Sequence, residues 1–144
     1  MHEFTIGESL VTAVLTELRR PEHVRLRLRR ARVVIGAMHA IVPDSLCLAY
    51  EVLTRETPAA GSVLEIVSVP PAARCRRCAW EGPIELPLFL CGACGSGDVE
   101  VQRGTELYLD QLEGEDDEHG ADQGIPGPDG REREVGGQDP RPAP

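Results

Sequence analysis

The sequence predicts an α+β protein: a small α/β sandwich of two helices on a three-stranded sheet, with a cysteine-containing module inserted before the last strand. Three observations predict this fold. Apolar residues recur at helical spacing in two segments, and in a third they alternate with arginines as in a half-buried strand. Four cysteines stand in two closely spaced pairs later in the chain.

The first helix is predicted over residues 5–20. Thr5 and Glu8 have the spacing of a capping box, in which the hydroxyl caps the first turn and the carboxylate reaches back to it. Apolar residues then recur every four positions, at Ile6, Leu10, Val14 and Leu18. We expect this stripe to face the core and Pro21 to end the helix.

A long strand is predicted over residues 24–35, where apolar residues alternate with Arg25, Arg27 and Arg29. Because side chains of a strand point to alternate faces, this pattern predicts one buried face, with a bulge near Arg30. We expect the arginine row to be a solvated face, and a surface for an acidic partner is the alternative.

The second helix and the remaining strands follow from the same rules. Pro43 opens a helix with a periodic apolar face, and the turn-forming residues 58–61 stop it. Residues 62–69 are expected to form a second strand, closed by a rigid pair of prolines. One or two strands within 99–109 are expected to return to the first sheet, since two strands alone make a poor platform.

The net charge of −9 is concentrated at the C-terminal end. Residues 111–144 hold ten acidic and three basic side chains, whereas residues 1–110 hold fourteen acidic and twelve basic ones. Residues 113–144 are rich in Gly, Pro and charge, a composition that cannot bury enough apolar area to offset its ordering entropy, so we expect an acidic, disordered tail. A weak metal sponge built on the tail's carboxylates and His119 is the alternative.

Composition also bears on location. The sequence has no run of about 18 or more apolar residues that would span a bilayer. Its N-terminus lacks the basic and apolar regions of a signal peptide. We therefore expect a cytoplasmic protein, and in that reducing compartment closely paired cysteines indicate metal ligands rather than disulfides.

Two C-x2-C pairs separated by twelve residues predict a zinc-ribbon-like module. Cys75 and Cys78 form the first pair, and Cys91 and Cys94 form the second. Each pair makes a tight turn that aims two thiolates at one point, and four thiolates leave no open position, so the zinc is expected to be structural. Iron in a rubredoxin-like site and a reversible dithiol are the alternatives. The fifth cysteine, Cys47, is expected to be a small buried hydrophobe.

Met1, His2 and Glu3 form a second candidate metal site. A free terminal amine, the deprotonated amide of residue 2 and that residue's imidazole Nδ1 close consecutive chelate rings. Glu3 would add the fourth donor, an amide nitrogen or its carboxylate. Nitrogen-rich tetragonal geometry suits Ni(II) or Cu(II) and does not suit zinc. Taken alone, a histidine at position 2 is also compatible with no metal role.

Taken together, these motifs resemble the HypA/HybF family, the nickel-incorporation proteins of NiFe-hydrogenase maturation. The resemblance covers roughly residues 1–110. It rests on these stretches, in order: Met1-His2-Glu3, Ile35-Gly36, Val42-Pro43-Asp44-Ser45-Leu46, Thr57-Pro58-Ala59-Ala60-Gly61, Cys75-Arg76-Arg77-Cys78, Cys91-Gly92-Ala93-Cys94-Gly95-Ser96 and Asp98-Val99-Glu100-Val101.

The resemblance implies that the N-terminal tripeptide carries nickel as cargo, through the amine of Met1, His2 and the backbone at Glu3, while the four cysteines carry zinc. It implies a nickel metallochaperone rather than an enzyme, acting with the GTPase HypB on the NiFe-hydrogenase large-subunit precursor.

The domain organisation expected on this basis has three parts. Residues 1–72 form the nickel-binding α/β domain, whose sheet is completed by 98–112. Residues 73–97 form the zinc-binding module, and 113–144 form the tail. Two features depart from the family. The long acidic tail lies outside the family core, and this chain has Ala37-Met38-His39 where the family often has an acidic residue after the strand-ending glycine. His39 is therefore a candidate extra nickel ligand.

A nucleic-acid-binding adaptor is the alternative function. It would use the zinc ribbon, with Arg74, Arg76, Arg77 and the strand arginines on phosphates. A near-neutral body, an acidic tail and only five aromatic residues argue against it. An enzyme is not indicated, because neither a Ser/His/Asp set nor a glycine-rich phosphate loop is evident.

Overall fold

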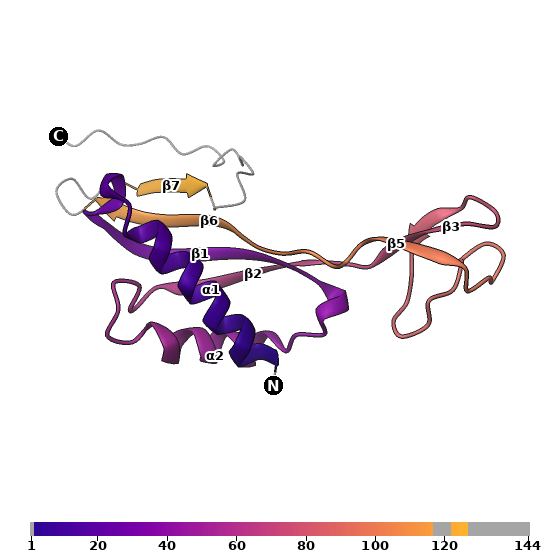
Figure 1. Cartoon of the computed structure of the whole chain (residues 1–144), viewed down its shortest axis with the longest axis horizontal. Coiled ribbons are helices and arrows are strands. Elements are labelled where there is room, and N and C mark those ends of the chain that lie inside the picture. Colours follow the sequence, from indigo (N-terminus) through magenta and orange to yellow (C-terminus); the bar gives the residue numbers. More distant parts are fainter. Residues whose placement is uncertain (1, 117–121, 127–144) are drawn as a thin grey trace. The chain divides into compact units, whose positions relative to one another are not determined.

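The computed structural model describes residues 2–116 and 122–126, which fold as two compact units. Unit 1 comprises the described residues up to 33, from 41 to 66 and from 108 onward, and unit 2 comprises 34–40 and 67–107. The elements are α1 (His2–Leu18), η1 (Pro21–His23), β1 (Leu26–Gly36), η2 (Ala37–His39), α2 (Pro43–Thr54), β2 (Val63–Val69), β3 (Ala72–Cys75), β4 (Glu81–Pro83), β5 (Val99–Arg103), β6 (Leu107–Asp116) and β7 (Asp122–Pro126) (Figure 1).

The predicted α+β fold is confirmed. Two helices accompany a sheet with strand order β2-β1-β6-β7, and a second sheet has the order β4-β3-β5. The first sheet therefore has one strand more than predicted, β7, which pairs antiparallel with β6 over residues 111–115. The predicted zinc module, 73–97, lies within unit 2. In the part of the chain that the structure describes, no helix is long and apolar enough to cross a bilayer.

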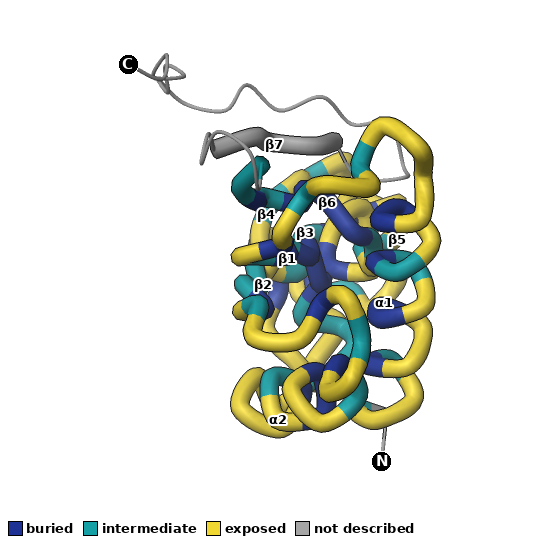
Figure 2. The backbone as a smooth tube through the Cα atoms, turned by 90° about the vertical axis from the view of Figure 1, so that its left-hand side faces the viewer, coloured by how far each residue is buried: buried dark blue, intermediate teal, exposed yellow. Residues whose placement is uncertain are grey.

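An apolar core fills unit 1 between the helices and the sheet. In Figure 2 the buried residues of α1 and α2 lie on the sides turned toward the strands. The two helices approach closely at Gly7, where an added Cβ would lie 3.2 Å from Leu53 Cδ1. The core side chains are Leu10, Val11, Val14, Leu18, Leu28, Ala31, Val33, Leu46, Ala49, Tyr50, Ala59, Leu64, Leu109 and Leu112.

The first helix begins earlier than predicted. α1 starts at His2, so Thr5 lies inside the helix and the predicted start at residue 5 is wrong. The reason is a tertiary contact: the Glu3 carboxylate accepts a hydrogen bond from the backbone N–H of Val42, with Oε2 at 3.1 Å, just before α2 begins. This bond ties the first turn of α1 to the start of α2.

Along β1, buried and accessible side chains alternate as predicted. The alternation is interrupted where two consecutive residues, Arg29 and Arg30, are both accessible to solvent. Its arginines are not simply solvated, because several form ion pairs with neighbouring strands. Arg30 Nη1 lies 3.5 Å from Glu65 of β2 and 3.4 Å from Glu113 of β6. Arg32 contacts the same Glu65 carboxylate at 3.3 Å. The charged row thus joins three strands of unit 1.

β6 extends through residues 113–116, which belong to the segment predicted to be a disordered tail. Two features explain the difference. Carboxylates there meet the arginines of β1, as Arg29 and Glu115 do at 3.9 Å. Gly114 allows close approach to the neighbouring strand, since an added Cβ would lie 2.5 Å from Arg27 O. The predicted disorder of 117–121 and 127–144 concerns residues outside those described.

One strand predicted to return to the first sheet does not do so. β5 pairs antiparallel with β3 in the second sheet, with Cys75 opposite Val99. Of β5 and β6, only β6 joins the first sheet. Gly104 separates the two strands with φ +111, and an added Cβ there would lie 2.9 Å from Pro71 Cα. This glycine conformation lets the chain pass close to Pro71 between its two strand pairings.

Candidate metal centre

The four paired cysteines of unit 2 meet at one point. The thiol sulfurs all lie within 4.8 Å of one another, with Cys75 Sγ 3.7 Å from Cys94 Sγ and Cys78 Sγ 3.5 Å from Cys91 Sγ. A tetrahedral zinc with bonds of about 2.3 Å requires sulfurs about 3.8 Å apart. The donor set and its spacing therefore fit a tetrahedral metal ion with four thiolate ligands.

The two cysteine turns have the same backbone geometry. Cys75 Sγ accepts N–H hydrogen bonds from Arg77 and Cys78 at 3.3 and 3.4 Å. Cys91 Sγ accepts the matching bonds from Ala93 and Cys94 at 3.2 and 3.3 Å. The residue after each pair is in the left-handed region, and there the chain turns back. These residues are Ala79, with φ 65, and Gly95, with φ 75.

The same N–H groups favour thiolates over thiols. The N–H of Cys78 is the largest of several hydrogen bonds that lower the pKa of Cys75. For Cys91, burial raises the pKa, but the N–H groups of Cys94 and Ala93 and the neighbouring thiols lower it to about 6. The two turns therefore favour the thiolate form of Cys75 and Cys91, which is the form that binds a metal.

Trp80 lies against the backbone of this module at two glycines. A Cβ added at either Gly82 or Gly92 would lie 2.6 Å from Trp80 Cζ2. The indole is thus held between the two glycines, and larger residues there would displace it. Sequence reasoning missed this contact. The signal for it was a single tryptophan close to Gly82 and to the glycine after Cys91.

Arginines near the cysteines are engaged by carboxylates of unit 2. Arg76 Nη1 lies 3.2 Å from Asp98 Oδ1, and Arg74 Nε lies 3.9 Å from Glu81 Oε2. Two of the three arginines next to the cysteines that an adaptor would place on phosphates therefore already have anionic neighbours, which disfavours the nucleic-acid-binding alternative.

The second predicted site lies at the N-terminus, in unit 1. Met1 is outside the described residues, and His2 begins α1. The carboxylate of Glu3 is half-buried and accepts the Val42 N–H bond described above. His39, the candidate extra ligand, belongs to unit 2, where its Nε2 lies 3.1 Å from Thr105 O.

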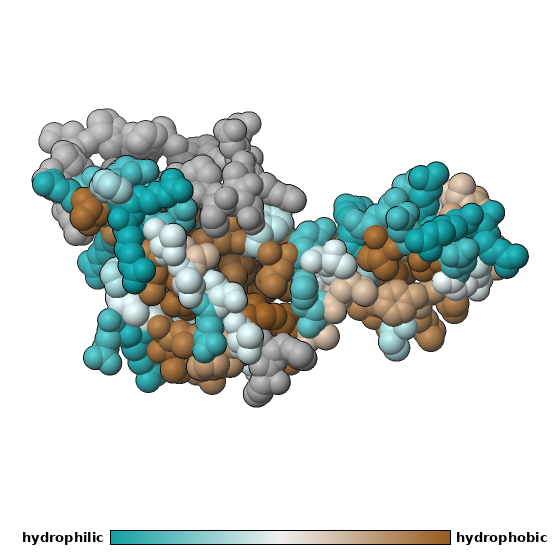
Figure 3. All heavy atoms as spheres, in the orientation of Figure 1, coloured by the Kyte–Doolittle hydropathy of each residue, from teal (hydrophilic) through white to brown (hydrophobic). Residues whose placement is uncertain are grey.

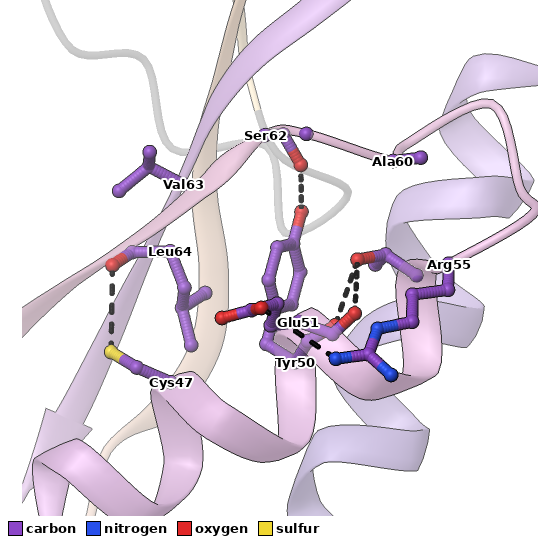
Figure 4. A pocket seen from close by; sticks show the side chains of 10 residues that line it. Cys47, Tyr50, Glu51, Arg55, Ala60, Ser62, Val63 and Leu64 are labelled. Atoms are coloured by element: carbon purple, nitrogen blue, oxygen red, sulfur yellow. Dashed lines mark hydrogen bonds and ion pairs between the residues drawn. The ribbon is translucent and has the colours of Figure 1, made fainter.

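Cys47 lies apart from the other cysteines, in a shallow hollow of about 460 Å³ between α2 and β2. Its Sγ lies 3.7 Å from Leu64 O, and Tyr50 Oη lies 2.7 Å from Ser62 Oγ (Figure 4). Burial and then the charge of Asp44 raise the pKa of the Cys47 thiol. This half-buried thiol is therefore poorly suited to bind a metal as a thiolate.

Comparison with known proteins places these features in a family. Residues 1–114 match the model of the HypA family, described as hydrogenase/urease nickel incorporation, metallochaperone. The hydrogenase maturation factor HypA of Trichodesmium erythraeum is 33% identical over 117 residues, covering 81% of this chain and 97% of the relative. HypA of Nostoc sp. is 34% identical over 116 residues, with the same shares covered.

Solved structures share the fold. The solution structure of the nickel metallochaperone HypA from Helicobacter pylori matches with a TM-score of 0.53 at 23% identity, covering 76% of this chain and 94% of that one. A second solution structure of a HypA protein matches with a TM-score of 0.55 at 25% identity, covering 78% and 94%. The family match ends before β7, which lies beyond residue 114.

Proposed function

Because the chain belongs to the HypA family of nickel-incorporation metallochaperones, which are not enzymes, we propose that it binds Ni(II) at its N-terminus and delivers the ion to the NiFe-hydrogenase large-subunit precursor. The match of the family model to residues 1–114 carries this proposal. Delivery takes place in the cytoplasm together with the GTPase HypB. Zinc in the four-cysteine site is a permanent structural ion, and nickel is the cargo.

The start of α1 supports the nickel site. The first four N–H groups of an α-helix have no carbonyl acceptor within the helix. Since α1 begins at His2, the amides of His2 and Glu3 belong to this first turn. They can lose their protons to a metal without breaking a helical hydrogen bond. A helix that began at residue 5 would not place these amides in a fixed turn.

The donor set then follows from the contacts of Glu3. Its carboxylate already accepts the Val42 N–H bond at 3.1 Å, so the Glu3 amide nitrogen is the better fourth donor. The terminal amine of Met1, the amide and imidazole Nδ1 of His2 and the amide of Glu3 make four nitrogen donors in one plane. Ni(II) accepts this tetragonal arrangement. The Glu3 carboxylate then orients the turn instead of binding the metal.

The deprotonated amides also explain how nickel can be released. Binding removes protons from two amides, so nickel affinity depends on pH and on competing ligands. A partner that offers its own ligands to the ion competes with amides that readily regain their protons. The four-cysteine site has no open position, so it is not expected to exchange its ion in this way.

Calorimetric titration with Ni(II) tests the site. The zinc-loaded, untagged protein should bind one nickel ion, and a short extension before Met1 or His2→Ala should abolish binding with zinc content unchanged. His23→Ala is the matched control, because His23 lies in η1 with its Nδ1 2.9 Å from Glu17 O. Undiminished nickel binding by the extended protein would refute the site.

Delivery is tested separately. Nickel-loaded wild-type protein, incubated with HypB and the large-subunit precursor, should transfer nickel that is recovered with the precursor after chromatography. The His2→Ala protein should transfer none. Equal transfer from the His2→Ala protein would refute the N-terminal site as the donor of that nickel.

A further inference from the structure

Unit 2 exposes a contiguous apolar loop between its two cysteine pairs. We call residues 86–90, Leu86-Pro87-Leu88-Phe89-Leu90, the apolar loop. The relative exposures of its large side chains are 39% for Leu86, 60% for Leu88, 38% for Phe89 and 46% for Leu90. Figure 3 shows apolar side chains gathered along one side of unit 2, opposite a hydrophilic side. Contiguous exposed apolar residues of this kind mark interaction sites.

The apolar loop is ordered by its own contacts. Glu85 and Leu88 form a β-bridge, and Leu90 N–H donates to Leu88 O at 3.0 Å. Cys91, directly after the loop, is buried as part of the four-cysteine cluster. Trp80 lies against Gly92, next to Cys91. A loop held in this way loses less conformational entropy when a partner covers it than a disordered loop would.

Charge selects the kind of partner. Residues 79–90 carry two carboxylates, Glu81 and Glu85, and no basic side chain. Glu81 already lies near Arg74, whereas Glu85 is exposed beside the apolar loop. This arrangement repels anionic membrane surfaces and complements a protein segment with basic residues next to its apolar face.

We propose that the apolar loop is a docking surface for an amphipathic protein segment whose apolar face is flanked by basic side chains. Leu88, the most exposed of its large apolar side chains, is the main anchor, and Glu85 contributes charge. The surface belongs entirely to unit 2 and uses none of the proposed nickel ligands. Its test is therefore independent of nickel binding, and either proposal can fail without the other.

Trp80 provides a local signal for the test, because it is the chain's one tryptophan and lies next to this loop. The probe is a tryptophan-free amphipathic helical peptide of leucine and lysine, titrated into the zinc-loaded full chain while Trp80 emission is recorded. The matched peptide replaces lysine by glutamate. The variants are Leu88→Ser and, as control, Leu48→Ser, whose leucine is also 60% exposed but lies on α2 of unit 1.

The proposal expects saturable binding of the lysine peptide with a blue shift of Trp80 emission. Leu88→Ser should weaken binding about tenfold, and Leu48→Ser should leave it unchanged. Glu85→Gln should weaken it about twofold, and the glutamate peptide should bind at least about tenfold more weakly. Zinc content verifies that each variant folds, and Leu86→Ser replaces any Leu88 variant that loses zinc.

Several results would overturn the proposal. Failure of both peptides to bind would remove it. Equal affinity for wild type and Leu88→Ser would mean that the peptide binds elsewhere on the protein. Binding to phosphatidylglycerol vesicles that Leu88→Ser abolishes would make the loop a membrane contact. Self-association of the wild type that Leu88→Ser abolishes would make a second copy the occupant.

Discussion

The two units of this protein reach a stable fold by different means. Unit 1 buries an apolar core contributed by both helices and the first sheet. Unit 2 buries few apolar side chains besides its cysteines, namely Val34, Ile35, Ala73 and Ile84. Two of the four cysteines, Cys75 and Cys91, are buried, and Cys78 and Cys94 are exposed. On the proposed function, a structural metal compensates for this small apolar core.

This difference also separates two uses of metal. In unit 2 the ligands come from two turns, in each of which a backbone N–H donates to the sulfur of the first cysteine of the pair. At the N-terminus of α1, in unit 1, the proposed donors belong to a single helical turn. On the proposed function, the first arrangement retains its ion and the second releases one. The nickel site then belongs to the unit that has its own apolar core, so release of nickel does not require unfolding.

Loss of zinc should have the largest effect and should be confined to unit 2. Cys91→Ala removes one of the buried thiolates, and structural zinc contributes on the order of 10 kcal/mol to folding. Amide hydrogen exchange should show loss of protection in β3 and β5, while α1 and α2 remain protected. Retained protection in β3 and β5 would mean that unit 2 folds without its metal.

A cavity in the apolar core of unit 1 should destabilise unit 1 alone. Leu46→Ala opens a cavity at a fully buried position and should lower the free energy of unfolding by about 2–5 kcal/mol. Denaturation followed by far-ultraviolet circular dichroism reports on α1 and α2. Zinc content should be unchanged, and Leu48→Ala, at an exposed position of the same helix, should cost less than about 0.5 kcal/mol. Zinc loss in Leu46→Ala would contradict the independence of the units.

The ion pairs formed by the arginines of β1 should contribute less to the free energy of unfolding of unit 1 than its apolar core does. Arg32 lies 3.9 Å from the fully buried Asp110 carboxylate and donates to Gln111 Oε1 at 3.1 Å. Arg32→Ala leaves a buried carboxylate without this cation and should cost about 1–3 kcal/mol by denaturation. Arg30→Ala, in a more exposed pair, should cost less than about 1 kcal/mol. An equal loss of stability in Arg32→Ala and Arg30→Ala would mean that the burial of Asp110 does not strengthen its ion pair with Arg32.

The smallest effects should come from the two left-handed positions of unit 2. Ala79→Gly relieves a strained conformation and should stabilise the unit by up to about 1 kcal/mol, whereas Gly95→Ala should destabilise it by a similar amount. The space around Gly95 is open, so backbone strain alone is tested. Trp80 fluorescence during denaturation measures both changes. Destabilisation by Ala79→Gly would show that the two turns are not equivalent.

Much of this fold could be predicted because local sequence signals agree with it. α2 begins at Pro43 and β2 covers 63–69, as the proline and the apolar segment predict. The spacing of the cysteines alone predicted that their four sulfurs lie together, as they do in the structure. In each of these cases a short segment contains all the information that the prediction needs.

The errors arose where distant residues decide the outcome. α1 starts at His2 because Glu3 contacts Val42, a partner 39 positions away that no local pattern reveals. The end of β6 is ordered because Glu113 meets Arg30 of another strand. The exposure of the apolar loop could not be predicted either, because its leucines have the composition of a core segment.

X-ray absorption spectroscopy of the nickel-loaded, zinc-replete and untagged protein tests most directly whether the two metals occupy separate sites. We predict four-coordinate planar nickel with four nitrogen neighbours and no sulfur, and zinc with four sulfur neighbours. Sulfur scattering around nickel would place nickel among the cysteines and contradict this assignment.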